Sequence, residues 1–159
     1  MHSWLAALRP RREPATPYER GVAAFDAGRH EEALAEFESA LALASGDAER
    51  MAARNKRGVT LVALGRRDAA LEDFCAALIL DERFAPALVN LGNLLLEDGH
   101  VRDAIDYYEA AIRADEKYAT AYRNLGIAHK RLGQRAESVR YLRTANRIEM
   151  RNPPKRFKA

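Results

Sequence analysis

The amino-acid sequence predicts an all-α protein built as a stack of four helix-turn-helix units. Three observations predict it: a composition that favours helix, a unit that recurs about every 34 residues, and apolar positions spaced as on one face of a helix. The chain has 159 residues, 48% hydrophobic and 31% charged, which is a globular composition. Alanine occurs 31 times and proline only 6 times, so the intrinsic propensity favours helix. A single cysteine excludes a disulfide framework and a zinc site made of several thiolates.

The internal repeat is visible in two columns of glycine with the same spacings of 37, 34 and 34 residues. The columns are Gly21, Gly58, Gly92, Gly126 and Gly28, Gly65, Gly99, Gly133. Alanine and large residues form two further columns, Ala40, Ala77, Ala111, Ala145 and Phe37, Phe74, Tyr108, Leu142. The second glycine column is placed to end a helix in the left-handed conformation. The first column lies mid-helix, where glycine is unfavourable, and therefore predicts close contact between the two helices of a unit.

Each unit has apolar faces that it cannot bury alone. In the third unit Leu88, Leu91, Gly92 and Leu95 follow the i, i+3, i+4, i+7 pattern of one helical face. Because one helix pair cannot cover both of its faces, we expect neighbouring units to stack into a solenoid. The predicted helices span 17–27, 30–44, 48–64, 67–80, 86–97, 101–114, 119–131 and 135–150.

The unit LVNLGNLLLEDGHVRDAIDYYEAAI resembles the tetratricopeptide repeat family. The resemblance covers nearly the whole chain, with a repeat domain over 14–152. It implies a right-handed α-solenoid whose repeats lie at about 14–47, 51–84, 85–118 and 119–152. It also implies the family's usual role, which is to hold other proteins.

Several positions depart from the family pattern. The closing proline of each unit is replaced by Ser45, Glu82, Glu116 and Met150. Arg20, Arg54 and Arg57 stand where apolar residues are usual. Three extra residues, 48–50, precede the second repeat, and we expect them to lengthen that helix by almost one turn while Met51 enters the core.

Most of the positive charge lies toward the two ends of the chain. Residues 1–13 form a basic N-terminal stub, in which Trp4 and Leu8 are expected to shield the first repeat; a membrane-surface anchor or a cleaved targeting leader is the alternative. Residues 13–118 carry 12 basic and 21 acidic residues, whereas residues 119–159 carry 11 basic and 2 acidic residues. Asn146 breaks an apolar column in the last helix, so we expect this helix to face solvent and a basic tail to follow over 153–159.

The residue types needed for catalysis do not gather in the sequence. The histidines are scattered, and His129 takes a position that is usually aromatic in the repeat, which predicts packing. Cys75 lies beside Phe74 with no histidine at helical spacing, so we expect a small buried or half-buried thiol. No apolar segment approaches transmembrane length. We therefore expect a cytoplasmic, non-enzymatic protein without metal, cofactor or small-molecule substrate.

The family resemblance places the binding surface on the concave wall formed by the first helix of each pair. A shift of one position from the packed face selects the candidate groove residues Asn55, Val89, Asn90, Asn93, Arg123, Asn124, Ile127 and Lys130. Side-chain amides can bind a peptide backbone through both donor and acceptor, and the cations would select carboxylates. The alternative is that asparagine is simply usual at these positions in the family. A carboxylate clamp of the kind that grips chaperone tails is not expected, because only Asn90 fits that pattern.

The predicted function is a non-catalytic adaptor or scaffold that binds a peptide or helical segment of another protein in the concave groove. We expect an acidic partner segment and a monomeric chain, and we expect neither nucleic acid nor membrane as the partner. The alternative is an accessory factor that docks RNA or an anionic membrane surface through its basic C-terminal repeat.

Overall fold

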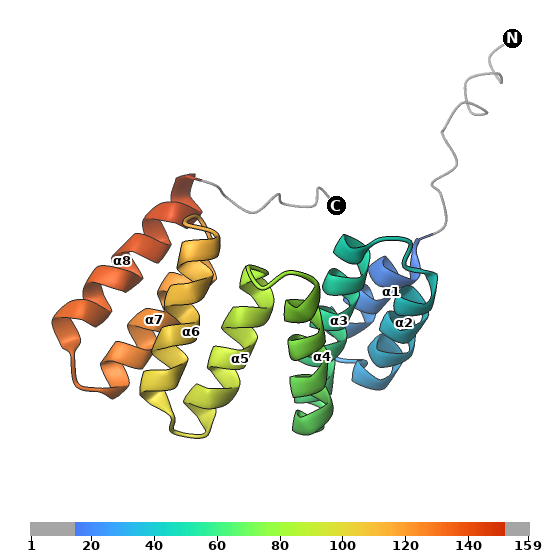
Figure 1. Cartoon of the computed structure of the whole chain (residues 1–159), viewed down its shortest axis with the longest axis horizontal. Helices are drawn as coiled ribbons and strands as arrows, with labels where there is room; N and C mark the ends of the chain where they lie inside the picture. Colours follow the sequence, from blue (N-terminus) through green and yellow to red (C-terminus); the bar gives the residue numbers. More distant parts are fainter. Residues whose placement is uncertain (1–14, 152–159) are drawn as a thin grey trace, which may run out of the picture.

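The computed structural model describes residues 15–151, a range in which all regular structure is helical. Its helices follow one another in antiparallel pairs (Figure 1). They are α1 Pro17–Asp26, α2 His30–Leu43, α3 Asp47–Ala63, α4 Arg67–Leu80, α5 Ala85–Glu97, α6 Val101–Ala114, α7 Ala119–Arg131 and α8 Arg135–Arg151. Each agrees with the predicted range to within one residue at either end. The N-terminal stub and the basic tail proposed from the sequence lie outside the described residues.

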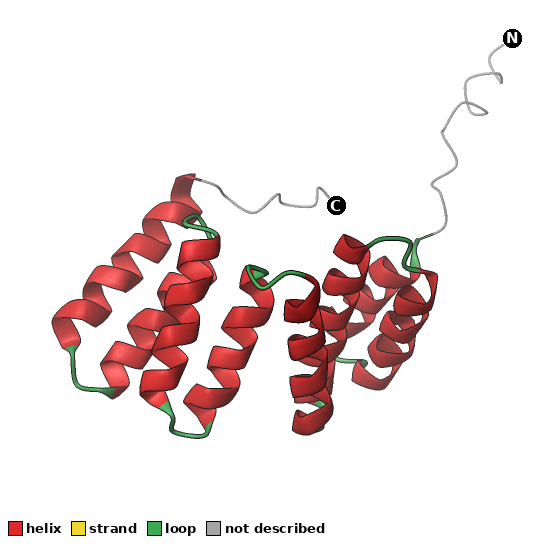
Figure 2. Ribbon diagram, in the orientation of Figure 1, coloured by secondary structure: helices red, strands yellow, loops and turns green. Residues whose placement is uncertain are grey.

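The helices form two layers. The odd-numbered helices α1, α3, α5 and α7 contact one another in succession, whereas the even-numbered helices contact only odd-numbered ones. Helices are joined by short connections at their ends, so the units stack along one direction (Figure 2). This arrangement confirms the predicted all-α solenoid of four helix pairs.

The two glycine columns have the two roles expected of them. A Cβ added to Gly92 would lie 2.6 Å from Cε1 of the Tyr108 ring, so α5 and α6 can approach closely only without a side chain there. The corresponding glycines of α1 and α3 meet the rings of Phe37 and Phe74 in the same way. Gly99, which ends the first helix of its pair, has a φ of +86°, where a side chain would be strained.

The insertion before the second repeat lengthens α3. This helix has 17 residues, whereas α5 and α7 have 13 each. Met51 packs against the apolar cluster formed around Leu61 and Phe74, as expected. The extra turn therefore extends α3 at its N-terminal end without moving the core positions that follow.

Packing is densest in the third repeat. Helix α5 contacts α3, α4, α6 and α7, and most of its residues are buried. The cluster of the first repeat is much smaller, with Ala24, Ala33 and Phe37 as its buried members. The N-terminal end of the stack thus buries fewer apolar side chains than its centre.

Candidate functional site

The candidate site lies on the accessible surface of α1, α3, α5 and α7, here called the odd-helix surface. Because these helices follow one another in space, equivalent positions of successive repeats form rows across this surface. Asn90 and Asn124 occupy one such row, and Asn93 and Ile127 occupy the next.

The structure brings the four predicted asparagines together as two pairs that cross between repeats. Nδ2 of Asn90 donates to Oδ1 of Asn55 at 2.8 Å, and Nδ2 of Asn124 donates to Oδ1 of Asn93 at 2.7 Å. The first pair links α3 to α5 and the second links α5 to α7. The asparagines therefore stabilise the stacking of neighbouring repeats as well as being placed at the candidate site.

Tyr108 helps to orient Asn93 in the pair that it forms with Asn124. Its ring is buried between α5 and α6, and its hydroxyl donates to Oδ1 of Asn93 at 2.9 Å. Burial raises the pKa of Tyr108 well above its ordinary value, so the hydroxyl keeps its proton and remains a donor. With two hydrogen bonds accepted at Oδ1, Asn93 presents its amide N–H groups, whereas Asn90 and Asn124 each present an acceptor oxygen and a second N–H.

Val89 is a correction to the predicted site. Its side chain is only 2% exposed and belongs to the core cluster of the third repeat, so it does not line an open surface. The reason is the central position of α5, which contacts four other helices and leaves only a narrow strip of its own surface uncovered. Asn55 is also buried, at 9% exposure, and its role in the pair is to hold Asn90.

One of the two predicted cations, Arg123, forms an ion pair within the fold. Arg123 forms an ion pair with Glu149 of α8, with 2.6 Å between Nη2 and Oε1. Lys130 and Ile127 of the same helix are exposed, and Ile127 keeps 39% of its surface accessible. This pairing was not predicted from the sequence, because the two residues lie on different helices and 26 positions apart.

Charge is distributed unevenly among the helices. Helices α2, α4 and α6 together carry ten acidic and three basic residues, a net charge of −7, whereas α8 carries two acidic and five basic residues, a net charge of +3. The odd-numbered helices carry five acidic and eight basic residues, a net charge of +3. The odd-numbered helices are therefore more attractive to an acidic segment than α2, α4 and α6 are.

The three arginines that depart from the family pattern form ion pairs with carboxylates of the second helix of their repeat, which were not predicted from the sequence. Arg57 holds Asp73 through two hydrogen bonds of 2.7 Å, and Arg54 adds a third at 3.2 Å; Asp73 is only 1% exposed. Arg20 binds Glu36 at the same position of the first repeat. The sequence does contain a pattern that could have predicted these pairs, since the arginine and its acidic partner are separated by sixteen residues in both repeats.

The described residues contain no constellation of catalytic or metal-binding groups. His129 stacks on the ring of Tyr141 with 5.2 Å between ring centroids, which confirms the packing role expected for it. Cys75 is exposed, so the expectation of a buried or half-buried thiol is wrong. Between residues 15 and 151, no group of three or more histidine, cysteine or carboxylate side chains is placed to hold a metal ion. No described helix is both long and apolar enough to cross a membrane.

Comparison with known proteins agrees with the fold. The tetratricopeptide repeat model matches residues 18–87 and 89–151, so the chain belongs to the tetratricopeptide repeat family. Its fold is therefore that of a protein-interaction scaffold, and members of this family are generally non-catalytic. A search of curated protein sequences finds no match.

Several solved structures resemble the chain. The crystal structure of MamA has a TM-score of 0.64 at 25% identity, covering 85% of this chain and 77% of MamA. TTC0263, a thermophilic tetratricopeptide repeat protein of Thermus thermophilus, has a TM-score of 0.69 at 25% identity, covering 84% of this chain and 73% of that protein. YrrB, described as a tetratricopeptide repeat protein with an unusual peptide-binding site, has a TM-score of 0.61 at 24% identity, with coverage of 86% and 69%.

Proposed function

We propose that this protein is an adaptor that binds a segment of another protein on its odd-helix surface, where the paired asparagines lie. The observation that carries the proposal is the set of oriented amides that connects the second, third and fourth repeats. These amides lie beside exposed apolar and cationic side chains of α7. Both features are suited to recognition, and neither requires a reaction.

The amides supply both halves of a backbone interaction. Asn93 offers N–H donors to a peptide carbonyl, because its oxygen is already engaged by Tyr108 and Asn124. Asn90 and Asn124 each offer an oxygen to a peptide N–H. Since the hydrogen bonds between repeats restrict these side chains before binding, less conformational entropy is lost when the segment docks.

The charge of the surface favours an acidic segment with apolar residues. Lys130 is exposed, and Lys56 occupies the position in its repeat that Asn90 and Asn124 occupy in theirs. Ile127 adds an apolar contact next to Lys130. Arg123 contributes less to the positive charge of this surface than Lys130 does, because Glu149 pairs with its guanidinium.

Peptide display on the full chain, followed by binding measurements with the selected peptides, tests the proposal. We expect the selected peptides to be enriched in aspartate, glutamate and large apolar residues. Replacing Asn90→Ala together with Asn124→Ala is expected to weaken binding by about 1–3 kcal/mol, because hydrogen bonds of the bound peptide are left unmade. Lys56→Glu with Lys130→Glu is expected to weaken it further and to slow association.

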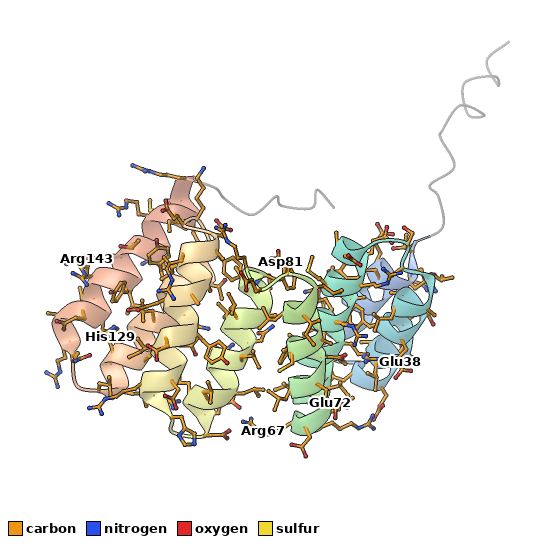
Figure 3. All side chains as sticks on the ribbon, viewed as in Figure 1. Glu38, Arg67, Glu72, Asp81, His129 and Arg143 are labelled. Atoms are coloured by element: carbon orange, nitrogen blue, oxygen red, sulfur yellow. The ribbon has the colours of Figure 1, made fainter. Side chains whose placement is uncertain are left out.

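The matched control reverses charge on the other layer. Glu38 of α2 and Glu72 of α4 are exposed, and Figure 3 labels both. Glu38→Lys with Glu72→Lys changes the net charge by the same amount as the lysine variant, with opposite sign, and leaves the odd-helix surface unaltered. If this control abolishes binding while the asparagine and lysine variants do not, the partner docks on the even-numbered helices and the proposal fails.

A second candidate function is docking to a polyanion, and it is favoured by the surface of α8. The arginines of this helix are all exposed, and none forms an ion pair with an acidic side chain among the described residues; they are Arg135, Arg140, Arg143, Arg147 and Arg151. Binding to RNA or anionic vesicles through this helix would weaken steeply with added salt, whereas binding of a peptide to the asparagine row would respond mildly. A salt titration with each probe distinguishes the two functions.

A further inference from the structure

The first junction between repeats contains an apolar cavity. This cavity, of about 570 Å³, lies between the N-terminal end of α1, the C-terminal end of α2 and the first turns of α3. Tyr18, Leu43 and a series of alanines line it, and these alanines are Ala40, Ala44, Ala48, Ala52 and Ala53. We call it the first-junction cavity.

The second repeat differs from the next two at one position of the junction. Phe84 and Tyr118 stand eight residues before the mid-helix glycine of their repeats, at the N-terminal ends of α5 and α7. Both are partly buried and pack against the core clusters. The same position of the second repeat is Arg50, whose guanidinium is engaged by Asp47 and the carbonyl of Ala44. The second repeat therefore lacks the packed aromatic side chain that the third and fourth repeats have at this position.

An aromatic side chain is available close to the cavity in the sequence. Residues 1–14 lie outside the described range and enter the fold next to Thr16 and Pro17, which themselves line the cavity. This segment contains Trp4, the only tryptophan of the chain, together with Leu5 and Leu8. Trp4 precedes Thr16 by twelve residues, a length that spans about 18 Å as helix and about 40 Å when extended.

We propose that the N-terminal segment folds back onto the first repeat and inserts Trp4 into the first-junction cavity. Trp4 then replaces the aromatic ring that Phe84 and Tyr118 supply at the other junctions. A tryptophan side chain buries about 150–250 Å² of surface, and an alanine-lined cavity removes that surface from water at little cost in side-chain entropy of the lining residues. Leu5 or Leu8 covers Leu43, which is 72% exposed beside the cavity.

The basic residues of the segment are compatible with this position. Arg9, Arg11 and Arg12 come between Trp4 and the start of α1. The carboxylate of Glu49 lines the cavity, and Asp47 begins α3 beside it.

Trp4 provides its own probe, since it is the only tryptophan. In the full chain we expect its fluorescence emission to be shifted to the blue relative to the chain unfolded in urea, with several-fold lower quenching by acrylamide. In nuclear Overhauser spectra its indole protons should show contacts with the methyl groups of Ala48 and Ala52. Emission equal to that of the unfolded chain would overturn the proposal.

Two variants change the cavity in different ways and leave Trp4 in place. Arg50→Phe restores the aromatic residue found at the other junctions and competes with Trp4 for the space. Ala52→Glu puts a charge into the lining. Each is expected to shift the Trp4 emission toward that of the unfolded chain, while circular dichroism confirms that the helices remain.

The matched controls make the same exchanges far from the cavity. Arg102→Phe on α6 and Ala136→Glu on α8 alter exposed positions and should leave the emission unchanged. A buried Trp4 that responds to neither cavity variant lies elsewhere, which contradicts the proposal. A blue shift that disappears on dilution shows that the segment binds a second copy of the chain, and this outcome also overturns it.

Discussion

At the residue scale, one pair of positions in the repeat holds an ion pair in some repeats and an apolar pair in another. In the first two repeats an arginine of the first helix binds a carboxylate of the second, as Arg57 binds Asp73. In the third repeat the same two positions hold Leu91 and Tyr107, which pack with the second core cluster. The backbone geometry of the repeat therefore accepts either a charged or an apolar pair, provided that both members change together.

This equivalence predicts a strong coupling between Arg57 and Asp73. Asp73→Tyr alone leaves Arg54 and Arg57 without their acceptor, and Arg57→Leu alone removes the main partner of a buried carboxylate. We expect each single change to lower the free energy of unfolding by about 1–3 kcal/mol, the usual cost of a buried polar group left unsatisfied. The double variant should recover part of this loss, because it reproduces the apolar pair of the third repeat.

Urea denaturation of the four proteins in this cycle provides the measurement. Additive losses, with no recovery in the double variant, would show that the two side chains do not act as a unit. The corresponding change of Arg20 and Glu36 is expected to have a smaller effect, since that ion pair is more exposed.

At the element scale, the lengthened α3 has its own capping arrangement. Glu49, in the first turn, accepts hydrogen bonds from the backbone N–H of Ser45 at 2.7 Å and from its hydroxyl at 3.0 Å. These bonds, led by that of the backbone N–H, lower the pKa of Glu49 below its ordinary value of 4.5. The cap therefore depends on an ionised carboxylate.

The pH dependence of this cap follows from the direction of the shift. The pKa of Glu49 is lower in the folded protein than in the unfolded chain. The cap therefore contributes fully to stability at pH values above the pKa of the unfolded chain, and this contribution is lost as the pH falls through the pKa of the folded protein. In an NMR titration we expect the carboxyl of Glu49 to show a midpoint below 4.5. Ser45→Ala removes the hydroxyl donor and should move the midpoint part of the way back. A midpoint at or above 4.5 in the unaltered protein would contradict the cap.

The alanine column is a second feature of the elements that can be tested. Ala111 of α6 is fully buried in the core cluster of the third repeat. Ala111→Leu adds three carbon atoms where the helices are already in contact, so we expect a loss of about 1–3 kcal/mol in stability from overpacking. Thermal melting checks this, with Ala136→Leu at an exposed position as the control. A melting temperature as high in Ala111→Leu as in the control would show that the column is not tightly packed.

At the scale of the whole molecule, charge is distributed unevenly along the stack. The residues up to 118 are predominantly acidic, whereas residues 119–159 carry 11 basic and 2 acidic side chains. Exposed charges of opposite sign attract each other over a Debye length of about 10 Å at 0.1 M salt. The two parts of different molecules can thus approach each other in solution.

We predict that the protein is a monomer at high salt and self-associates head to tail as the salt concentration falls. Sedimentation velocity across a salt series measures this. Reversal of charge in α8, by Arg143→Glu with Arg147→Glu, should suppress the association at low salt, because both side chains are exposed. Oligomers that persist unchanged at high salt would instead indicate an apolar interface.

Much of this architecture was determined by the sequence itself. The glycine and alanine columns predicted the number of helices, their order and their bounds, because each repeat satisfies the same local packing rule. The positive φ of Gly99 and the contact between Gly92 and Tyr108 follow from positions that could be read directly from the repeat. The placement of Asn90 and Asn124 on one row was predictable for the same reason.

Only the tertiary structure decided which of those side chains are free to act. Burial of Val89 results from four helices meeting α5, and the pairing of Arg123 with Glu149 joins residues that are 26 positions apart. The first-junction cavity likewise depends on how three helices meet, since residues of α1, α2 and α3 line it together. Repeat periodicity describes the environment that successive units share, whereas burial, ion pairing and cavities depend on which particular neighbours meet in space.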